Sequence, residues 1–136
     1  MKNKLLCVNL PCYSTIQDFV ENDYQYNPAL GLLALTEYAT MFGFESYVKD
    51  FNYNEVNYDE LFEFIESKGI TVIGFTSYTE NLNIMFKFMR MIKSYNRDIV
   101  LVVGGPHATL RPDEVIKNRN VDYVIPNDGE STLLEL

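Results

Sequence analysis

The chain has 136 residues, 47% of them hydrophobic, and its 19 acidic and 11 basic residues give a formal net charge of −8. That length suits one domain, and the hydrophobic content is enough for a core. A negative field repels phosphate groups, which argues against nucleic acid and anionic membranes as partners. Two cysteines do not make a disulfide framework. No apolar run is long enough for a membrane span or a signal peptide, so we expect a cytoplasmic protein.

Apolar runs and helical patterns alternate along the chain. A strand is expected at residues 5–8, followed by a long polar segment at 10–27 and a helix from Pro28 to Gly43. The further elements that we expect are a strand at 44–48, a helix at 58–68, a strand at 70–75, a helix through 82–89, a strand at 99–103, a helix from 112, a strand at 121–125 and a helix from 130.

This alternation predicts a parallel sheet with helices on both faces. Five units of this size favour a flavodoxin-like, doubly wound α/β fold, a Rossmann-like three-layer sandwich with strand order 2-1-3-4-5. We expect one domain over residues 1–136. Because the sequence stops within its last helical pattern, we also expect that domain to be part of a longer protein.

The ligand of such a sheet lies beyond the carboxyl ends of the strands, where the strand order reverses. Four connections reach that edge, at residues 10–27, 76–80, 104–109 and 126–130. The first is longer than usual for a strand-to-helix connection, and long connections are often functional. The second carries three hydroxyl groups and an aromatic ring, and the third begins with two glycines that would let a bulky ligand approach the backbone.

Each of these features has a structural alternative. The glycine pair suits a tight turn, and Thr79 suits the N-cap of the following helix, which would leave Ser77 freer for a ligand. His107, the single histidine, suits a loop hydrogen bond better than a metal site. Asp128 and Glu130 suit the positive end of the last helix.

Several chemistries lack their residues here. Asn9 and Thr76 stand where a receiver domain needs carboxylates, and the sequence has no P-loop, no G-x-G-x-x-G after the first strand and no G-x-S-x-G. It also lacks the Cys-x3-Cys-x2-Cys motif that holds an iron–sulfur cluster in radical SAM proteins. We therefore assign no catalytic and no metal-ligating residue.

Seven segments, taken in order, resemble the cobalamin (B12)-binding domain found at the front of radical SAM enzymes. They are PALGLLAL at 28–35, the strand ending in Asp50, IGFTS at 73–77, GGPHAT at 104–109, PDE with VDYV at 112–114 and 121–124, and DGESTLLEL at 128–136. GGPHAT at this place is the most specific of them.

The resemblance implies a module that holds cobalamin against a radical SAM domain downstream, which would carry S-adenosylmethionine and a 4Fe-4S cluster. It places the nucleotide tail near residues 76–77 and 104–105 and the corrin over the first loop and the GGPHAT segment. The cofactor-binding residues it implies are Ser14, Thr15, Pro28, Gly31, Thr76, Ser77, Tyr78, Thr79, Gly104, Gly105, Pro106, His107, Asp128, Gly129 and Glu130.

The sequence departs from related patterns in two places. The loop after the first strand has no histidine, so cobalt would have no lower histidine ligand of the methionine synthase type, and Asn127-Asp128 replaces the usual Gly-Glu.

Two other functions stay open. One is a degenerate module that docks partners without a cofactor, for which loop tyrosines would suit an interface: Tyr13, Tyr24, Tyr26, Tyr53 and Tyr58. The other is an unrelated nucleotide- or flavin-binding domain of the same fold.

Overall fold

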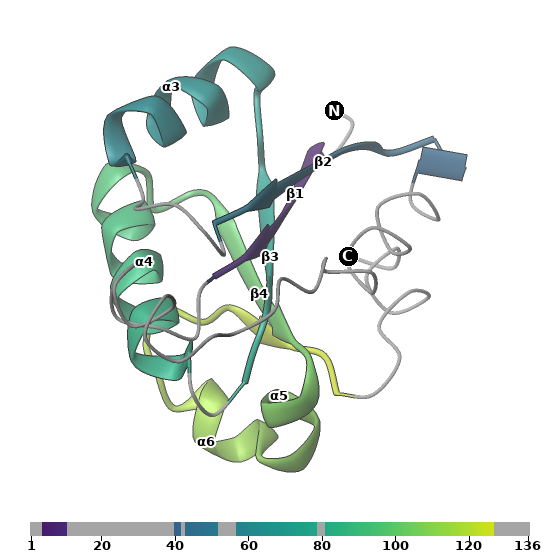
Figure 1. Cartoon of the computed structure of the whole chain (residues 1–136), viewed down its shortest axis with the longest axis vertical. Coiled ribbons are helices and arrows are strands. Elements are labelled where there is room, and N and C mark those ends of the chain that lie inside the picture. The colour runs from purple at the N-terminus through teal and green to yellow at the C-terminus, as the bar shows by residue number, and fades with distance from the viewer. Residues whose placement is uncertain (1–3, 11–39, 42, 52–56, 79–80, 127–136) are drawn as a thin grey trace, which may run out of the picture.

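The computed structural model describes residues 4–10, 40–41, 43–51, 57–78 and 81–126. Five strands form one parallel sheet with the order β2-β1-β3-β4-β5, which confirms the predicted fold and strand order (Figure 1). The strands are β1 (Lys4–Asn9), β2 (Glu45–Asp50), β3 (Val72–Thr76), β4 (Val100–Gly104) and β5 (Tyr123–Val124). The described helices are α3 (Tyr58–Lys68), α4 (Leu82–Tyr95), α5 (Pro106–Leu110) and α6 (Pro112–Ile116).

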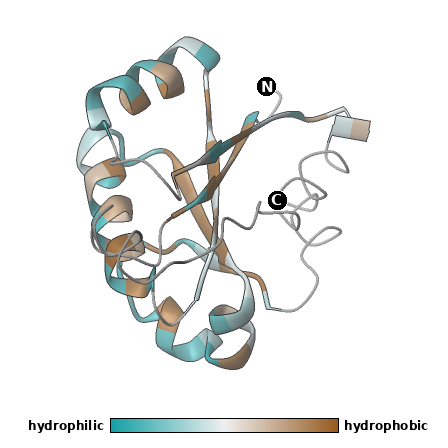
Figure 2. Cartoon of the chain, viewed as in Figure 1, coloured by the Kyte–Doolittle hydropathy of each residue, from teal (hydrophilic) through white to brown (hydrophobic). Residues whose placement is uncertain are grey.

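The central strands are buried on both faces, and their side chains alternate between two apolar clusters. Leu6 of β1, Ile73 of β3 and Leu101 of β4 point to the face that is covered by α3, α4 and α6. Leu5 and Val72 belong to the cluster on the opposite face. The central strands carry much of the brown, hydrophobic colour in Figure 2. Apolar side chains buried on both faces are typical of a parallel sheet.

Helix α3 begins and ends where the sequence predicts. The Asn57 side chain accepts a hydrogen bond from the backbone N–H of Glu60 at 3.2 Å, which caps the first turn. Gly69 ends the helix with φ +69°, a left-handed conformation that favours glycine. Short-range capping patterns therefore located this element correctly.

Other expectations were wrong in detail. Strand β2 covers Glu45–Asp50 rather than residues 44–48, and β5 has two residues rather than five. The 104–109 segment was expected to be a loop, but α5 begins at Pro106 within it. Tyr58 is not a loop tyrosine, because it opens α3 and its ring packs against Phe88 with centroids 5.7 Å apart.

Helix α4 begins after Asn81, so Asn81 rather than Thr79 occupies the N-cap position. Its buried face consists of Met85, Phe88, Met89 and Ile92, which pack on the sheet. Within the described ranges, none of the helices is long and apolar enough to cross a membrane.

Candidate functional site

The carboxyl ends of β3 and β4 lie side by side, with Thr76 paired to Gly104 in the sheet register. The segments that follow them therefore meet at one edge of the sheet, at the lower end of Figure 1. We call the described residues there the carboxyl-edge site: Thr76, Ser77, Tyr78, Gly104, Gly105, Pro106 and His107. The structure thus brings together the two predicted connections at 76–78 and 104–107.

Gly105 takes a conformation that other residues rarely adopt. Its φ is +91°, and a Cβ atom added there would lie 2.5 Å from Thr76 Oγ1 and 2.7 Å from the Ser77 backbone nitrogen. The missing side chain thus lets two turns of the protein pack against each other. For Gly105 the tight-turn interpretation accounts for the glycine without a ligand.

The Ser77 side chain is fully buried and bonds to the neighbouring segment. Its hydroxyl donates to the Gly104 carbonyl oxygen at 2.6 Å and accepts from the Ala108 backbone N–H at 3.0 Å. The Ser77 carbonyl oxygen also accepts from the His107 backbone N–H at 3.0 Å. Ser77 therefore joins the end of β4 to the first turn of α5, and its hydroxyl is not free for a ligand as the sequence suggested.

Asn81 is a residue of this edge that the sequence reasoning missed. It is fully buried, its Oδ1 accepts from the Tyr78 backbone N–H at 2.9 Å, and its Nδ2 donates to the Thr76 carbonyl oxygen at 3.3 Å. The side chain therefore fixes the turn that presents Thr76 and Tyr78. An asparagine just before a helical pattern was the available signal.

His107 lies inside the protein rather than on the rim. Its side chain is 8% exposed, and Nε2 is 3.5 Å from the Glu114 Oε1 of α6. This contact ties the adjacent helices α5 and α6 together. Among the described residues, no group of three His, Cys, Asp or Glu side chains is arranged to hold a metal ion.

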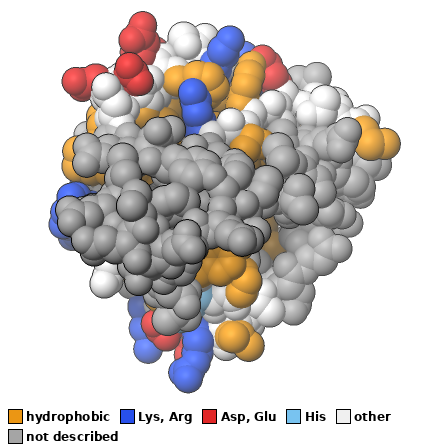
Figure 3. All heavy atoms as spheres, in the orientation of Figure 1, with side chains coloured by type: hydrophobic (Ala, Val, Ile, Leu, Met, Phe, Trp, Pro, Cys, Tyr) orange, Lys and Arg blue, Asp and Glu red, His pale blue; other side chains and the backbone are white. Residues whose placement is uncertain are grey.

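The accessible part of the site is small and largely uncharged. Tyr78 is 38% exposed and Pro106 is exposed, while Thr76 and Gly104 are half-buried. In Figure 3 hydrophobic side chains also reach the surface around the histidine, at the end of the molecule formed by α5 and α6. A ligand at this edge would meet an aromatic ring, a proline, a hydroxyl group and bare backbone.

The other predicted site residues lie outside the described residues. They are Ser14, Thr15, Pro28, Gly31, Thr79, Asp128, Gly129 and Glu130. Their roles stay predictions from the resemblance.

A family model for the B12 binding domain matches residues 16–136, most of the chain and all of the carboxyl-edge site. The chain belongs to the B12-binding domain family. This agrees with the family that the GGPHAT and neighbouring segments indicated.

A curated relative of this B12-binding domain is the "uncharacterized methyltransferase PH0819" of Pyrococcus horikoshii. The two are 28% identical over 98% of this chain, which spans 28% of the relative. The chain therefore corresponds to about a quarter of that protein.

Solved structures share the fold of this B12-binding domain at low identity. The radical S-adenosylmethionine methyltransferase TsrM of Kitasatospora setae superposes with a TM-score of 0.77 at 18% identity, over 98% of this chain and 25% of its own. The cobalamin-dependent S-adenosylmethionine radical enzyme OxsB superposes with a TM-score of 0.72 at 17% identity, over 98% of this chain and 18% of its own. A CheY-like protein of Pseudomonas aeruginosa superposes with a TM-score of 0.61 at 14% identity, over 98% of this chain and 97% of its own. This agrees with a flavodoxin-like fold.

The described edge of this B12-binding domain fits a large, flat cofactor with a polar tail. Gly104 presents no side chain, and the Tyr78 and Pro106 surfaces offer apolar contact, which suits a corrin ring. The half-buried Thr76 has its hydroxyl group beside Gly105. The site is thus built from the kinds of groups that position a cofactor rather than from groups that react with it.

Proposed function

We propose that this chain binds cobalamin at the carboxyl-edge site and serves as the cobalamin module of a radical SAM enzyme of the methyltransferase type. The family match over residues 16–136 carries the proposal. The relative and two fold neighbours support it, because they are described as methyltransferases or as a cobalamin-dependent radical enzyme.

In this proposal the chain itself positions and shields the cofactor. Tyr78 and Pro106, which are exposed, would contact the corrin, and the half-buried Thr76 and Gly104 would receive the nucleotide tail. Asn81 and Ser77 act as positioning residues, because their buried side chains bond to the backbone of the two segments and fix the place of each. Bound cobalamin would supply the methyl-carrying metal centre, and the protein would supply shape, hydrogen bonds and a low dielectric.

The proposal also assigns the radical chemistry to a partner domain. The 136 residues contain no Cys-x3-Cys-x2-Cys motif, so S-adenosylmethionine and a 4Fe-4S cluster would be bound by a radical SAM domain placed against this one. The relative's methyltransferase name favours methyl transfer as the reaction of the assembled enzyme.

Titration of the chain with hydroxocobalamin tests the proposal. We expect co-elution of cofactor and protein and a change in the visible spectrum of the cofactor that saturates at one equivalent per chain. Tyr78→Ala should weaken binding roughly tenfold, because a contacting aromatic side chain commonly contributes more than about 1 kcal/mol to an interface.

Tyr95→Ala is the matched control, since Tyr95 is also 38% exposed but ends α4 at the opposite edge of the sheet. Its affinity should equal that of the wild type. No co-elution with a folded chain would refute cobalamin binding, and equal losses in both variants would refute the location of the site.

A further inference from the structure

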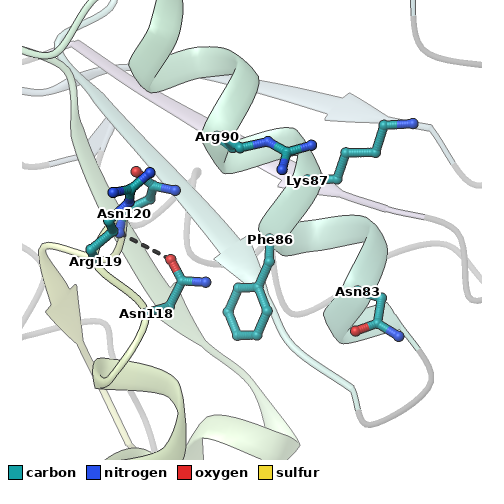
Figure 4. A pocket seen from close by; sticks show the side chains of 7 residues that line it. All are labelled: Asn83, Phe86, Lys87, Arg90, Asn118, Arg119 and Asn120. Carbon is teal, nitrogen blue, oxygen red and sulfur yellow. Dashed lines mark hydrogen bonds between the residues drawn. The ribbon is translucent and has the colours of Figure 1, made fainter.

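A pocket lies on the helical face, away from the carboxyl edge. It has a volume of about 380 Å³ and lies between α4 and the turn that joins α6 to β5 (Figure 4). We call it the α4–α6 pocket. It shares no residue with the carboxyl-edge site.

Three cations surround this pocket in a protein of net charge −8. Lys87 and Arg90 extend from α4, and Arg119 lies on the turn across the pocket from α4 (Figure 4). All three are exposed, and within the described part of the chain none of them forms an ion pair. Among the described residues that line the pocket, none is acidic. The cations are therefore available to an external anion.

The pocket wall is set by the fold. Asn83, Lys87 and Arg90 follow one another at helical spacing on one stripe of α4, while the opposite stripe is buried in the core. In the turn, the Asn120 backbone N–H donates to Asn118 Oδ1 at 3.0 Å, and the Asn118 carbonyl oxygen accepts from the Val121 backbone N–H at 3.1 Å. These two bonds fix the backbone of the turn, and so the position from which the Arg119 side chain extends.

The remaining lining residues suit a polypeptide. The amide groups of Asn83, Asn118 and Asn120 can donate to and accept from a peptide backbone, and the half-buried Phe86 ring offers apolar contact at the base. Three cations are few for a nucleic acid, and the net negative charge opposes one. We propose that the α4–α6 pocket docks an acidic segment of a protein partner, with its carboxylates on Lys87, Arg90 and Arg119.

A fluorescein-labelled peptide of alternating Glu and Ser tests this at low ionic strength. Fluorescence anisotropy should detect binding to the chain, and the amide resonances of Lys87, Arg90 and Arg119 should shift on titration. A peptide of alternating Gln and Ser should not bind. Arg90→Glu and Arg119→Glu should each weaken binding roughly tenfold, since each replaces an attraction by a repulsion.

Arg97→Glu is the matched control, because Arg97 is exposed beyond the end of α4, does not line the pocket, and changes the net charge equally. It should bind like the wild type. Equal weakening by Arg97→Glu, or equal binding of the neutral peptide, would overturn the proposal. Shifts of these resonances by inorganic phosphate, with no binding of the acidic peptide, would also overturn it and indicate a phosphate site. The proposal does not depend on cobalamin binding.

Discussion

Gly104 and Gly105 are neighbours in sequence, but the structure gives them different roles. Among the described residues, a Cβ at Gly104 would meet the Ile125 carbonyl oxygen, at 3.4 Å. A Cβ at Gly105 would instead enter the turn that contains Thr76 and Ser77. From the sequence, both glycines could serve either a ligand or a tight turn. For Gly105 the structure supports the tight turn, because an added side chain would overlap the neighbouring turn of the protein itself.

We predict that Gly105→Ala lowers the free energy of unfolding by about 2 kcal/mol or more, since it combines a left-handed conformation with a steric overlap. Gly104→Ala should cost less than about 1 kcal/mol, because it meets only one tight contact. Urea unfolding of both variants measures the difference. Equal costs would show that the turn rearranges and does not need glycine at residue 105.

Ser77 and Asn81 show why the sequence could predict the site only in part. Polar residues after the strands indicated a polar site at the carboxyl edge. The predicted strand order then placed the ends of β3 and β4 next to each other. Whether a hydroxyl group faces a ligand or the protein depends on long-range contacts, such as that of Ser77 with Ala108. Those contacts exist only once β3 and β4 are paired, so residue type and spacing could not reveal them.

At the scale of elements, the strongest periodic segments were predicted well and the shortest were not. Helix α5 has five residues, too few for a periodic pattern. It stops at Arg111, whose φ of −136° and ψ of 59° are not helical, because the residue before Pro112 is disfavoured in a helix. The same proline then opens α6, so one proline divides what would otherwise be a single helix.

A tertiary interaction also explains a segment that resembled a family motif. Asp122 of the VDYV segment lies before β5, and its Oδ2 accepts from Lys93 Nζ at 2.7 Å and from the Leu101 backbone N–H at 2.8 Å. The carboxylate thus joins α4, β4 and the start of β5. Its place in the motif is explained by the fold without a role in binding.

Helix α3 carries a prediction that depends on pH. Burial raises the pKa of Tyr58 above its ordinary value of 10.0, and the positive charge of Arg90 partly opposes this. The neutral phenol is therefore favoured in the folded state. The Tyr58 contribution to the free energy of unfolding is complete below pH 10.0 and is lost as the pH rises through the folded-state pKa.

Replacing Tyr58 by Phe removes this titration and keeps the ring that packs on Phe62 and Phe88. We expect the free energy of unfolding to fall less steeply for Tyr58→Phe than for the wild type as the pH is raised past 10.0. Urea unfolding on both sides of that pH measures the slopes. Identical slopes would contradict a raised pKa for Tyr58.

At the scale of the whole molecule, the alternation of apolar strands and amphipathic segments was sufficient to predict the fold. A parallel sheet buried on both faces needs continuous apolar strands, and residues 99–103 are apolar throughout. The mixed composition of β2 agrees with its place at the edge of the sheet. The α4–α6 pocket could not be predicted, because it joins two segments that are distant in the sequence.

Amide hydrogen exchange with and without saturating hydroxocobalamin tests the central claim most directly, because it locates the cofactor on the fold. We predict slower exchange in residues 76–78 and 104–107 and unchanged exchange in residues 83–90 and 118–120 of the α4–α6 pocket. Slower exchange at the pocket with none at the carboxyl edge, or no change at either place, would contradict it.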